Sequence, residues 1–449
     1  MTDSIFKNPG QTAFAGHRLS AVDYQQNFAD IQTPLDIHSA VVEADRCYYC
    51  YDAPCQTACP TSIDVPGFIR MIGQKNDLGA ASKILTENIM GGTCARACPV
   101  ETLCEHACVR QGEEGGPVQI GLLQRFATDQ VNLSEAKFFT RDTPTGYRVA
   151  IIGAGPAGLS CAHRLAVLGH EVFIYEAQQK SGGLNEYGLA AYKMADDYAQ
   201  REVEAILSIG GINIKNGVKV GEDISFAELQ TNYDAVFMGV GLGSSNALRL
   251  DGEQAEGIIS AVDYIHHLRQ AEDLGELPVG QDVVVIGGGM TAIDIAIQIK
   301  RLGAANVTMA YRRGKENMSA SLEEQEFALN EGVRIVHWAQ PVGLQTNKGF
   351  ITGVEFKATN TPDSDSYTMA ADMVFKAIGQ SLTPIVTGDI EFAQSHGKIA
   401  VDAERRTSHM GIWAGGDCVA GGDDLAVTAV QDGKLAALSI HNTLTQQQI

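Results

Sequence analysis

Residues 149–158 read Val149-Ala150-Ile151-Ile152-Gly153-Ala154-Gly155-Pro156-Ala157-Gly158, a four-residue apolar run followed at once by a glycine-rich turn. An apolar run that ends in such a turn and leads into a helix predicts a strand–turn–helix that binds a dinucleotide. Gly153 permits the tight turn, Gly155 lets the backbone approach a pyrophosphate, and Gly158 lets the helix pack on the strand. The N-terminus of the helix then offers its unpaired N–H groups to the phosphates.

The same pattern recurs at residues 283–292, where Val283-Val284-Val285-Ile286 precede Gly287-Gly288-Gly289-Met290-Thr291-Ala292. Gly287 and Gly289 take the first two glycine positions, and Ala292 takes the third, which the fingerprint allows. The two copies lie a domain length apart, unlike the short period of a solenoid repeat. The sequence therefore predicts an α/β fold with two Rossmann-like dinucleotide-binding domains.

The residues that end each second strand distinguish the two nucleotides. Glu176 ends the strand at residues 172–176, where its carboxylate can accept both ribose hydroxyls, so an unphosphorylated ribose is expected there. Arg312 and Arg313 follow the strand at residues 307–311, and two guanidinium groups in that place favour a 2′-phosphate. The second site is therefore predicted to bind NADP(H), with NAD(H) as the alternative. In the other interpretation, both arginines lie on a solvated edge of the sheet.

A segment near the C-terminus reads Gly411-Ile412-Trp413-Ala414-Gly415-Gly416-Asp417-Cys418 and precedes a helical run. By itself a Gly-Asp pair indicates only a turn. After two dinucleotide units, the segment resembles the second flavin fingerprint of two-dinucleotide-domain flavoproteins, in which the aspartate contacts the ribityl chain. Gly182 and Gly183 match the close-approach loop of the same proteins. The resemblance implies that the first unit holds FAD and that the NADP domain is inserted in the FAD domain, with ranges 145–265 and 380–449 for FAD and 266–379 for NAD(P)H.

The composition limits the class of partner. The chain has 449 residues, with 33 Lys and Arg against 54 Asp and Glu, and its net charge of −21 repels phosphate backbones and anionic lipid. No nucleic-acid partner is therefore expected. No membrane is expected either, because no uncharged apolar stretch reaches the roughly 18 residues of a spanning helix. The start, Met1-Thr2-Asp3-Ser4-Ile5-Phe6, has no pattern of a secretory signal, so a cytoplasmic location with reduced thiols is expected.

Eight of the ten cysteines fall between Cys47 and Cys108. They form a run, Cys47-x2-Cys50-x4-Cys55-x3-Cys59-Pro60, and a second group, Cys94-x3-Cys98-Pro99 followed by Cys104 and Cys108. Three close thiolates with a distant fourth, and a proline after the run, are typical of two-cluster ferredoxins. Residues 1–140 are therefore predicted to form a helical domain with two [4Fe–4S] clusters, although the x4 spacing departs from the ferredoxin run. The alternative is a pair of zinc sites, but the region has only one of the C-x2-C knuckles that zinc sites usually pair.

The cysteine region resembles the amino-terminal half of dihydropyrimidine dehydrogenase, on Arg46-Cys47, Asp52-Ala53-Pro54-Cys55, Ala58-Cys59-Pro60, Thr93-Cys94-Ala95-Arg96-Ala97-Cys98-Pro99 and Leu103-Cys104. The resemblance extends from about residue 40 to the C-terminus, and the separate flavin and iron–sulfur subunit of the bacterial enzyme is similar in length and order. It implies one cluster held by Cys47, Cys50, Cys55 and Cys108, and a second held by Cys59, Cys98, Cys104 and Gln124. Cys94 is then not a ligand. In the alternative interpretation, Gln124 is an ordinary solvated residue of a helix.

The resemblance also implies an activity. Nicotinamide gives up a hydride while a cluster accepts one electron, and a flavin converts between the two. The chain is expected to be an NAD(P)H-dependent flavin iron–sulfur oxidoreductase subunit that passes electrons from NADPH through FAD and two [4Fe–4S] clusters. The expected partner is an FMN-containing subunit that reduces uracil and thymine to dihydropyrimidines within a hetero-oligomer.

Two other hypotheses remain from the sequence. The small subunit of NADPH-dependent glutamate synthase shares this architecture, and a non-catalytic iron–sulfur redox sensor or scaffold is an alternative of another class. Disulfide reduction is not expected, because no C-x2-C pair lies in either nucleotide domain, and Cys161 and Cys418 are predicted to be packing residues.

Overall fold

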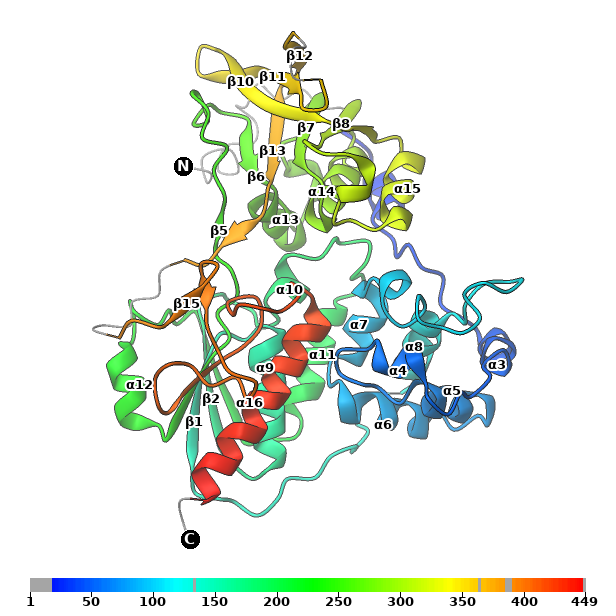
Figure 1. Cartoon of the computed structure of the whole chain (residues 1–449), viewed down its shortest axis with the longest axis vertical. Helices are drawn as coiled ribbons and strands as arrows, with labels where there is room; N and C mark the ends of the chain where they lie inside the picture. The colour runs from blue at the N-terminus through cyan, green and yellow to red at the C-terminus, as the bar shows by residue number, and fades with distance from the viewer. Residues whose placement is uncertain (1–17, 132–134, 362–364, 384–389, 447–449) are drawn as a thin grey trace. The chain divides into compact units, whose positions relative to one another are not determined.

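The computed structural model describes residues 18–131, 135–361, 365–383 and 390–446 (Figure 1). Five short ranges lie outside the described residues. They are 1–17 and 132–134 of the predicted cluster domain, 362–364 of the predicted NAD(P)H range, and 384–389 and 447–449 of the predicted FAD range. The described chain contains two parallel sheets with flanking helices and a helical, cysteine-rich region before them. The predicted fold class, α/β with a helical N-terminal region and two Rossmann-like folds, is confirmed.

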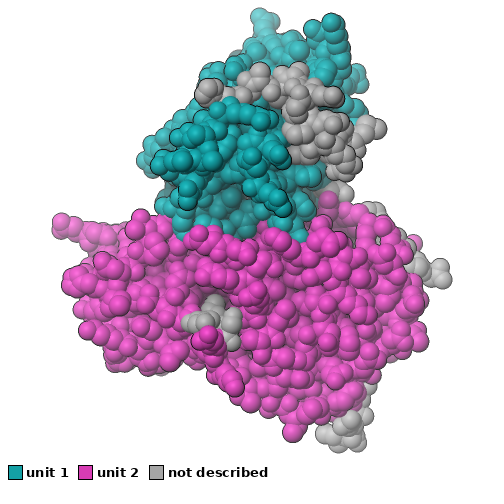
Figure 2. All heavy atoms as spheres, turned by 180° about the vertical axis from the view of Figure 1, so that it is seen from behind, with its two compact units in different colours: residues 1–31, 187–195, 244–381 teal, residues 32–186, 196–243, 382–449 magenta. Residues whose placement is uncertain are grey.

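Two compact units make up the fold, and Figure 2 colours them separately. Unit 1 comprises the described parts of residues 1–31, 187–195 and 244–381, and unit 2 those of residues 32–186, 196–243 and 382–449. Unit 2 therefore holds both the cysteine-rich helices and the first glycine turn, and unit 1 holds the second glycine turn. The boundaries of the three predicted domains stay a prediction.

Short helices carry the cysteines in unit 2. They are α3 (Ile37–Asp45), α4 (Pro54–Thr57), α5 (Val65–Gly73), α6 (Asp77–Glu87), α7 (Gly91–Ala97) and α8 (Ile120–Asp129), with the 3-10 turn η1 (Val100–Thr102). The side chains of Asp36, Asp64 and Asn76 accept backbone N–H groups at the starts of α3, α5 and α6, as N-cap residues do. The apolar face of α5, with Phe68 and Ile72, packs into a small core that several cysteines border.

The first glycine turn lies in a five-stranded parallel sheet of order β17-β4-β1-β2-β3. The strands are β1 (Arg148–Ile152), β2 (Glu171–Glu176), β3 (Ile212–Asn216), β4 (Ala235–Met238) and β17 (Ile412–Ala414). Side chains alternate along a strand, so Val149 and Ile151 face one core and Ala150 and Ile152 face another. Both faces are covered, which explains the continuous apolar run in the sequence.

Helices cover both faces of this sheet. On one face, α9 (Pro156–Val167) and α16 (Ala426–Gln446) pack against each other, with α11 (Tyr198–Leu207) beside them, and on the other lies α12 (Phe226–Asn232) (Figure 1). The remaining elements of unit 2 are β15 (Gln394–Ser395), β16 (Lys398–Ile399) and α10 (Leu184–Tyr187), whose last residue belongs to unit 1.

Unit 1 contains the second parallel sheet, of order β6-β13-β7-β8-β9. Its strands are β6 (Ile258–Ser260), β7 (Asp282–Gly287), β8 (Asn306–Ala310), β9 (Arg334–Val336) and β13 (Met373–Ala377). One face packs against α13 (Ala261–Gln270), α14 (Met290–Arg301) and α15 (Leu322–Asn330). The other face packs against an antiparallel ladder of β10 (Ala339–Asn347), β11 (Phe350–Ala358) and β12 (Tyr367–Ala370).

Smaller elements complete unit 1. They are α2 (Ala21–Asn27), η2 (Leu274–Glu276), η3 (Lys315–Asn317), β5 (Ser244–Ser245) and β14 (Gln380–Ser381). The short segment 187–195 is fixed to α14 and α15 by polar contacts, because Lys193 Nζ lies 2.8 Å from Asp294 Oδ1 and 2.6 Å from Glu324 Oε1. The N–H group of Ala191 also donates to Gln298 Oε1 at 3.0 Å.

The close packing of α16 on α9 depends on a glycine. A Cβ atom at Gly433 would lie 2.2 Å from the carbonyl oxygen of Ala157 and 2.8 Å from the nitrogen of Cys161. Gly433→Ala should therefore lower the free energy of unfolding by about 1 to 3 kcal/mol, although alanine favours the helix by about 1 kcal/mol. Urea unfolding of the FAD-loaded protein, followed by release of flavin fluorescence, measures this.

Gly112→Ala is the matched control, because no heavy atom lies within 4 Å of the added Cβ. Its free energy of unfolding should stay within about 0.5 kcal/mol of the parent value. Equal losses for the two variants would contradict the packing argument.

Candidate functional site

The first glycine turn joins β1 to α9 and is closed to any side chain at two points. A Cβ atom at Gly153, whose φ is +94°, would lie 2.4 Å from the carbonyl oxygen of Gly239, and one at Gly158 would lie 2.0 Å from the carbonyl oxygen of Gly153. Gly155, in contrast, faces open space, with only the Cα of Gly183 within 4 Å, at 3.8 Å. It is the N-cap of α9, and no side chain caps the helix. The first N–H groups of α9 therefore face an open site formed by Gly153, Gly155 and Gly158, which we call the first cradle.

Glu176 lies at the mouth of this cradle. Its side chain is 7% exposed, its Oε2 accepts the N–H of Ala154 at 2.7 Å, and its Oε1 accepts the N–H of Gln178 at 2.7 Å. These two hydrogen bonds hold the carboxylate against the glycine turn. Each carboxylate oxygen can accept a further hydrogen bond, such as one from a ribose hydroxyl.

Two further groups of predicted residues lie against the same glycine turn. Gly182 donates its N–H to the carbonyl oxygen of Ala154 at 2.8 Å, and a Cβ at Gly183 would lie 2.7 Å from the Cα of Gly155. The loop of Gly182 and Gly183 therefore packs directly on the cradle. Gly416, next to Asp417, lies against the first turn of α9, because its Cβ position is 3.1 Å from the Cβ of Ala157.

Asp417 carries an unusual carboxyl group. Burial raises its pKa to about 6, and the described residues provide no hydrogen bond to its carboxylate. A half-buried carboxylate without a hydrogen bond from the described residues fits the hydroxyl-rich ribityl chain of FAD, and the open glycine cradle beside it fits the pyrophosphate. The seven residues predicted for the flavin site thus come from four separate parts of the sequence and surround one place.

The second glycine turn, in unit 1, has the same construction. A Cβ atom at Gly287 would lie 2.2 Å from the carbonyl oxygen of Ala377. Gly289 is the N-cap of α14 without a side-chain cap, and Ala292 is fully buried in the first turns of that helix. The open N–H groups of α14 fit the pyrophosphate of a second dinucleotide.

Arg312 and Arg313 follow β8 at the end of the sheet that carries this turn. Their backbone is fixed, because Thr359 Oγ1 donates to the carbonyl oxygen of Arg312 at 2.7 Å and the Trp338 N–H donates to that of Arg313 at 3.1 Å. Both side chains are exposed, and neither guanidinium has a hydrogen bond or ion pair to the part of the chain that the structure describes. Two unpaired cations at this position are available to an anionic group.

Four cysteines of the first predicted set line one small cavity, namely Cys47, Cys50, Cys55 and Cys108. The loop that brings the first three together is tightly curved, with φ of +52° at Tyr49 and +37° at Ala53. Burial raises the pKa of the Cys47 thiol, and it raises that of Cys55 to about 11, with the neighbouring thiols adding to both shifts. The sequence therefore brings four thiols to one place, where a cationic inorganic group would stabilise their ionised form.

The cysteines of the second set also lie close together, and with Cys94 there are five candidates for the four predicted positions. Cys59 lies close enough to Cys98 and Cys104 to help raise the pKa of both, and the largest cause of the raised pKa at Cys98 is a hydrogen bond with the Cys94 thiol. Gln124 is 8% exposed, and its Nε2 donates to the carbonyl oxygen of Gly91 at 2.7 Å. That bond fixes the amide and leaves Oε1 without a hydrogen bond from the described residues. Across the described residues, no three His, Cys, Asp or Glu side chains converge as tightly as a single metal ion requires.

A buried carboxylate that the sequence did not indicate supports the second set. Glu202 of α11 is 2% exposed and accepts the N–H groups of Gly92 and Thr93, each at 3.0 Å, and the hydroxyl of Thr93. These groups form the N-terminus of α7, the helix that carries Cys94 and leads to Cys98. Glu202 lies in an ordinary amphipathic stretch, so only the packing of α11 on α7 reveals its role.

Comparison with known proteins identifies the chain's family. Residues 147–433 match the pyridine nucleotide-disulphide oxidoreductase family, and residues 24–136 match dihydropyrimidine dehydrogenase domain II, 4Fe-4S cluster. The chain belongs to the pyridine nucleotide-disulphide oxidoreductases. It is an NAD(P)-dependent flavin oxidoreductase that binds FAD and NAD(P) and carries a 4Fe-4S domain.

Curated members of this family align along nearly the whole chain. The NAD-dependent dihydropyrimidine dehydrogenase subunit PreT of Salmonella typhimurium is 37% identical, over 94% of this chain and 98% of its own length. PreT of Escherichia coli K12 is 36% identical over the same shares. The glutamate synthase [NADPH] small chain of Escherichia coli K12 is 33% identical, over 93% of this chain and 94% of its own length.

Solved structures of oxidoreductases share the fold. The thioredoxin reductase of T. acidophilum covers 67% of this chain and 99% of its own, with a TM-score of 0.55 and 23% identity. FprA of Mycobacterium tuberculosis in complex with NADPH covers 67% of this chain and 85% of its own, with a TM-score of 0.56 and 18% identity. Of the helices in the described ranges, none is long and apolar enough to cross a membrane.

The burial of Glu202 predicts a pH dependence. Desolvation raises the pKa of this carboxyl from 4.5 to about 7, so the folded protein keeps a proton that the unfolded chain loses in that interval. The free energy of unfolding should therefore fall as the pH rises, by about 2 kcal/mol between about pH 5.5 and pH 8 relative to Glu202→Gln, which cannot titrate. Anaerobic urea unfolding at the two pH values measures the difference.

Glu204→Gln is the control, because Glu204 lies on the same helix with an exposed side chain. It should keep the pH profile of the parent protein. If Glu202→Gln also keeps that profile, the buried carboxylate does not titrate as stated.

Proposed function

We propose that this chain is the electron-input subunit of a dihydropyrimidine dehydrogenase, which takes electrons from NADPH and delivers them through FAD and two [4Fe–4S] clusters to a partner subunit. One observation carries the proposal. Two sets of cysteines and the first cradle, with Glu176 and Asp417, all belong to one compact body, unit 2. The likeness to PreT subunits over 94% of the chain supports it.

Residues around the first cradle hold the flavin nucleotide in this proposal. The N–H groups of α9 bind the pyrophosphate, with Gly153, Gly155 and Gly158 allowing its approach. Glu176 accepts the hydroxyls of the adenosine ribose, and Asp417 accepts those of the ribityl chain. The loop of Gly182 and Gly183 closes the cradle from the other side.

Residues of unit 1 hold the nicotinamide nucleotide. The open N–H groups of α14 bind its pyrophosphate at Gly287, Gly289 and Ala292, and the two unpaired guanidinium groups bind the 2′-phosphate of NADP(H). The PreT relatives bear the name NAD-dependent, whereas the glutamate synthase relative is named for NADPH. The exposed arginines favour NADPH for this chain.

The two thiol sets hold the clusters. Cys47, Cys50, Cys55 and Cys108 bind one, and Cys59, Cys98, Cys104 and the Oε1 of Gln124 bind the other. A flavin accepts a hydride from reduced nicotinamide and gives up electrons singly to iron–sulfur clusters. Glu202 and Thr93 fix the start of α7 and so hold Cys98 in place for its ligand role.

The redox chemistry proposed does not use a protein dithiol. The region that matches the pyridine nucleotide-disulphide oxidoreductases contains two cysteines, Cys161 in α9 and Cys418 after β17, and both side chains are fully buried. Burial raises the pKa of Cys418 to about 12, which suppresses the thiolate that disulfide exchange needs. Electrons therefore leave through the clusters to a partner, proposed to be an FMN-containing subunit that reduces uracil and thymine within a cytoplasmic hetero-oligomer.

A second candidate is the small subunit of an NADPH-dependent glutamate synthase, which the 33% identity to that chain and the two arginines favour. Purification of the native complex and assay of NADPH oxidation with uracil, and separately with glutamine plus 2-oxoglutarate, separates the two. We expect turnover with uracil. Turnover with only the second pair would assign the chain to glutamate synthase.

The isolated subunit gives an independent test of electron input. Anaerobically purified, FAD-loaded and iron-replete protein should reduce an artificial one-electron dye with NADPH. A complete lack of dye reduction would favour a redox sensor or scaffold without turnover.

The arginine pair predicts cofactor preference. Arg312→Ala and Arg313→Ala, each made singly, should raise the KM for NADPH about tenfold and change the KM for NADH less than about twofold, because only NADPH carries the 2′-phosphate. Steady-state dye reduction measures both. Arg334→Ala is the control, since this exposed arginine begins β9, and its partner in register is Thr308 in the middle of β8, before the carboxyl end where Arg312 lies. Equal losses for both cofactors in the Arg312 variant would remove the phosphate role.

The choice between Cys94 and Gln124 predicts iron content. Gln124→Ala should lose about half of the iron, because one of two clusters loses a ligand, whereas Cys94→Ala should keep the full content. Iron analysis and electron paramagnetic resonance of the reduced proteins measure this. Loss of iron in Cys94→Ala alone would make Cys94 the fourth ligand.

A further inference from the structure

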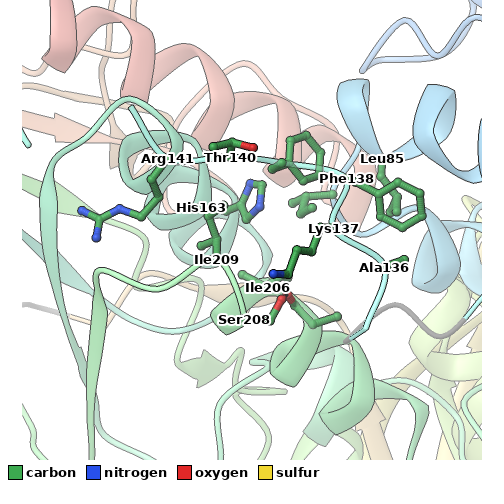
Figure 3. Close-up of a pocket in the computed structure, with 13 residues that line it drawn as sticks. Leu85, Ala136, Lys137, Phe138, Thr140, Arg141, His163, Ile206, Ser208 and Ile209 are labelled. Carbon is green, nitrogen blue, oxygen red and sulfur yellow. Dashed lines mark hydrogen bonds between the residues drawn. The ribbon is translucent and has the colours of Figure 1, made fainter. Parts of the chain in front are cut away.

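A cavity of about 570 Å³ lies in unit 2, and none of the residues predicted to bind a nucleotide or cluster lines it. It is bounded by the end of α6, by α9, by the end of α11 and by the extended segment 136–141 (Figure 3). Its volume is within the range of pockets that bind small organic molecules, about 300 to 1,000 Å³.

The charge of the lining differs from that of the chain. Lys137 and Arg141 line the cavity and no acidic residue does, although acidic residues outnumber basic ones 54 to 33 in the chain. The guanidinium of Arg141 is already used, because it donates to the carbonyl oxygens of Ala166 and His170. The ammonium group of Lys137 makes no hydrogen bond or ion pair with the described residues, and Figure 3 shows it extending toward Ile206 and Ser208.

His163 supplies a second unpaired polar group. Its side chain is 4% exposed and contacts Phe139 edge to face, with ring centroids 4.7 Å apart. Neither ring nitrogen has a hydrogen-bond partner in the described ranges, and the ring projects into the cavity (Figure 3). Burial lowers the pKa of His163 to about 3, so the ring is neutral and offers one donor and one acceptor. The ring nitrogens are not closed off from the solvent in the cavity, so a ligand there can hydrogen-bond to one of them.

The rest of the lining is apolar. Phe138 and Phe139 come from the extended segment, and Leu85, Ile89, Ile206 and Ile209 provide aliphatic surface. Aromatic side chains prefer edge-to-face or offset stacking with another ring, so two phenylalanines favour a planar ligand.

We propose that this cavity binds a small amphipathic carboxylate with a planar aromatic body. The ring packs against the phenylalanines of segment 136–141 and against Ile206 and Ile209 at and after the end of α11. The carboxylate contacts Lys137, and a ring nitrogen of His163 hydrogen-bonds the ligand. The site is separate from the flavin, nicotinamide and cluster sites and does not depend on the identity of the partner subunit.

The test is isothermal titration calorimetry of the full-length, FAD-loaded and iron-replete protein with 1-naphthylacetate, compared with its neutral analogue 1-naphthylacetamide. Saturating NADP⁺ is present so that the dinucleotide site is covered. We expect one site, with the acid bound about fivefold more tightly than the amide at about 0.15 M salt. Equal affinity of the two, or no heat with either at millimolar concentration, would overturn the proposal.

Variants locate the site. Lys137→Gln should weaken the acid about fivefold and leave the amide unchanged, whereas Ala136→Trp, which fills the cavity, should weaken both more than about tenfold. His163→Phe should weaken both about threefold, through loss of the hydrogen bond.

Lys357→Gln, at an exposed lysine in β11 of unit 1, is the matched control and should change neither affinity. Unaltered binding in Lys137→Gln and Ala136→Trp, with parental flavin and iron contents, would place the ligand elsewhere and refute the proposal.

Discussion

The approach of backbone to backbone at the two glycine turns is the constraint on which both nucleotide sites depend. At Gly153, Gly158 and Gly287, a carbonyl oxygen lies less than 2.5 Å from where a Cβ atom would be, so these positions accept only hydrogen. The same contacts set where α9 and α14 begin and leave their first N–H groups without a side-chain cap. Sheet, helix and phosphate cradle are therefore fixed together, and β17 pairs with β4 to bring residues from the far end of the chain beside the first cradle.

Polar contacts join the cysteine-rich helices to the flavin fold in unit 2. Glu202 accepts two N–H groups at the start of α7, and Lys434 of α16 lies 2.9 Å from Glu87 Oε2 and donates to the carbonyl oxygen of Thr61. Arg96 of α7 pairs with Asp129 at 2.7 Å and stacks over the ring of Tyr198, 3.6 Å from its centroid. Buried charges are stable only when paired in this way, so the relative position of the thiol sets and the flavin cradle is specified by geometry and not by apolar packing alone.

The sequence predicted those parts of the site that local rules determine. The strands, the glycine turns and Glu176 follow from one local pattern within residues 149–176, and the division of the thiols into two sets was implied by a family resemblance. Local rules could not predict contacts between distant segments. Glu202 resembles any residue of an amphipathic helix. The β10–β12 ladder covers a face of the second sheet for which the sequence predicted no covering element. Cys94 and Gln124 illustrate the same limit, because Cys94 contacts Cys98, Gln124 is tied to the start of the same helix, and only bond formation to a metal distinguishes them.

The chain passes between its two units five times, after residues 31, 186, 195, 243 and 381. Segment 187–195 supplies Lys193 to the acidic pair of Asp294 and Glu324, although it follows the flavin loop of Gly182 and Gly183 almost immediately in sequence. A crossover between related genes at any single junction would separate residues that must stay matched. Because unit 1 is built from three separate stretches of the chain, replacing it as a whole would require new junctions at all five crossings.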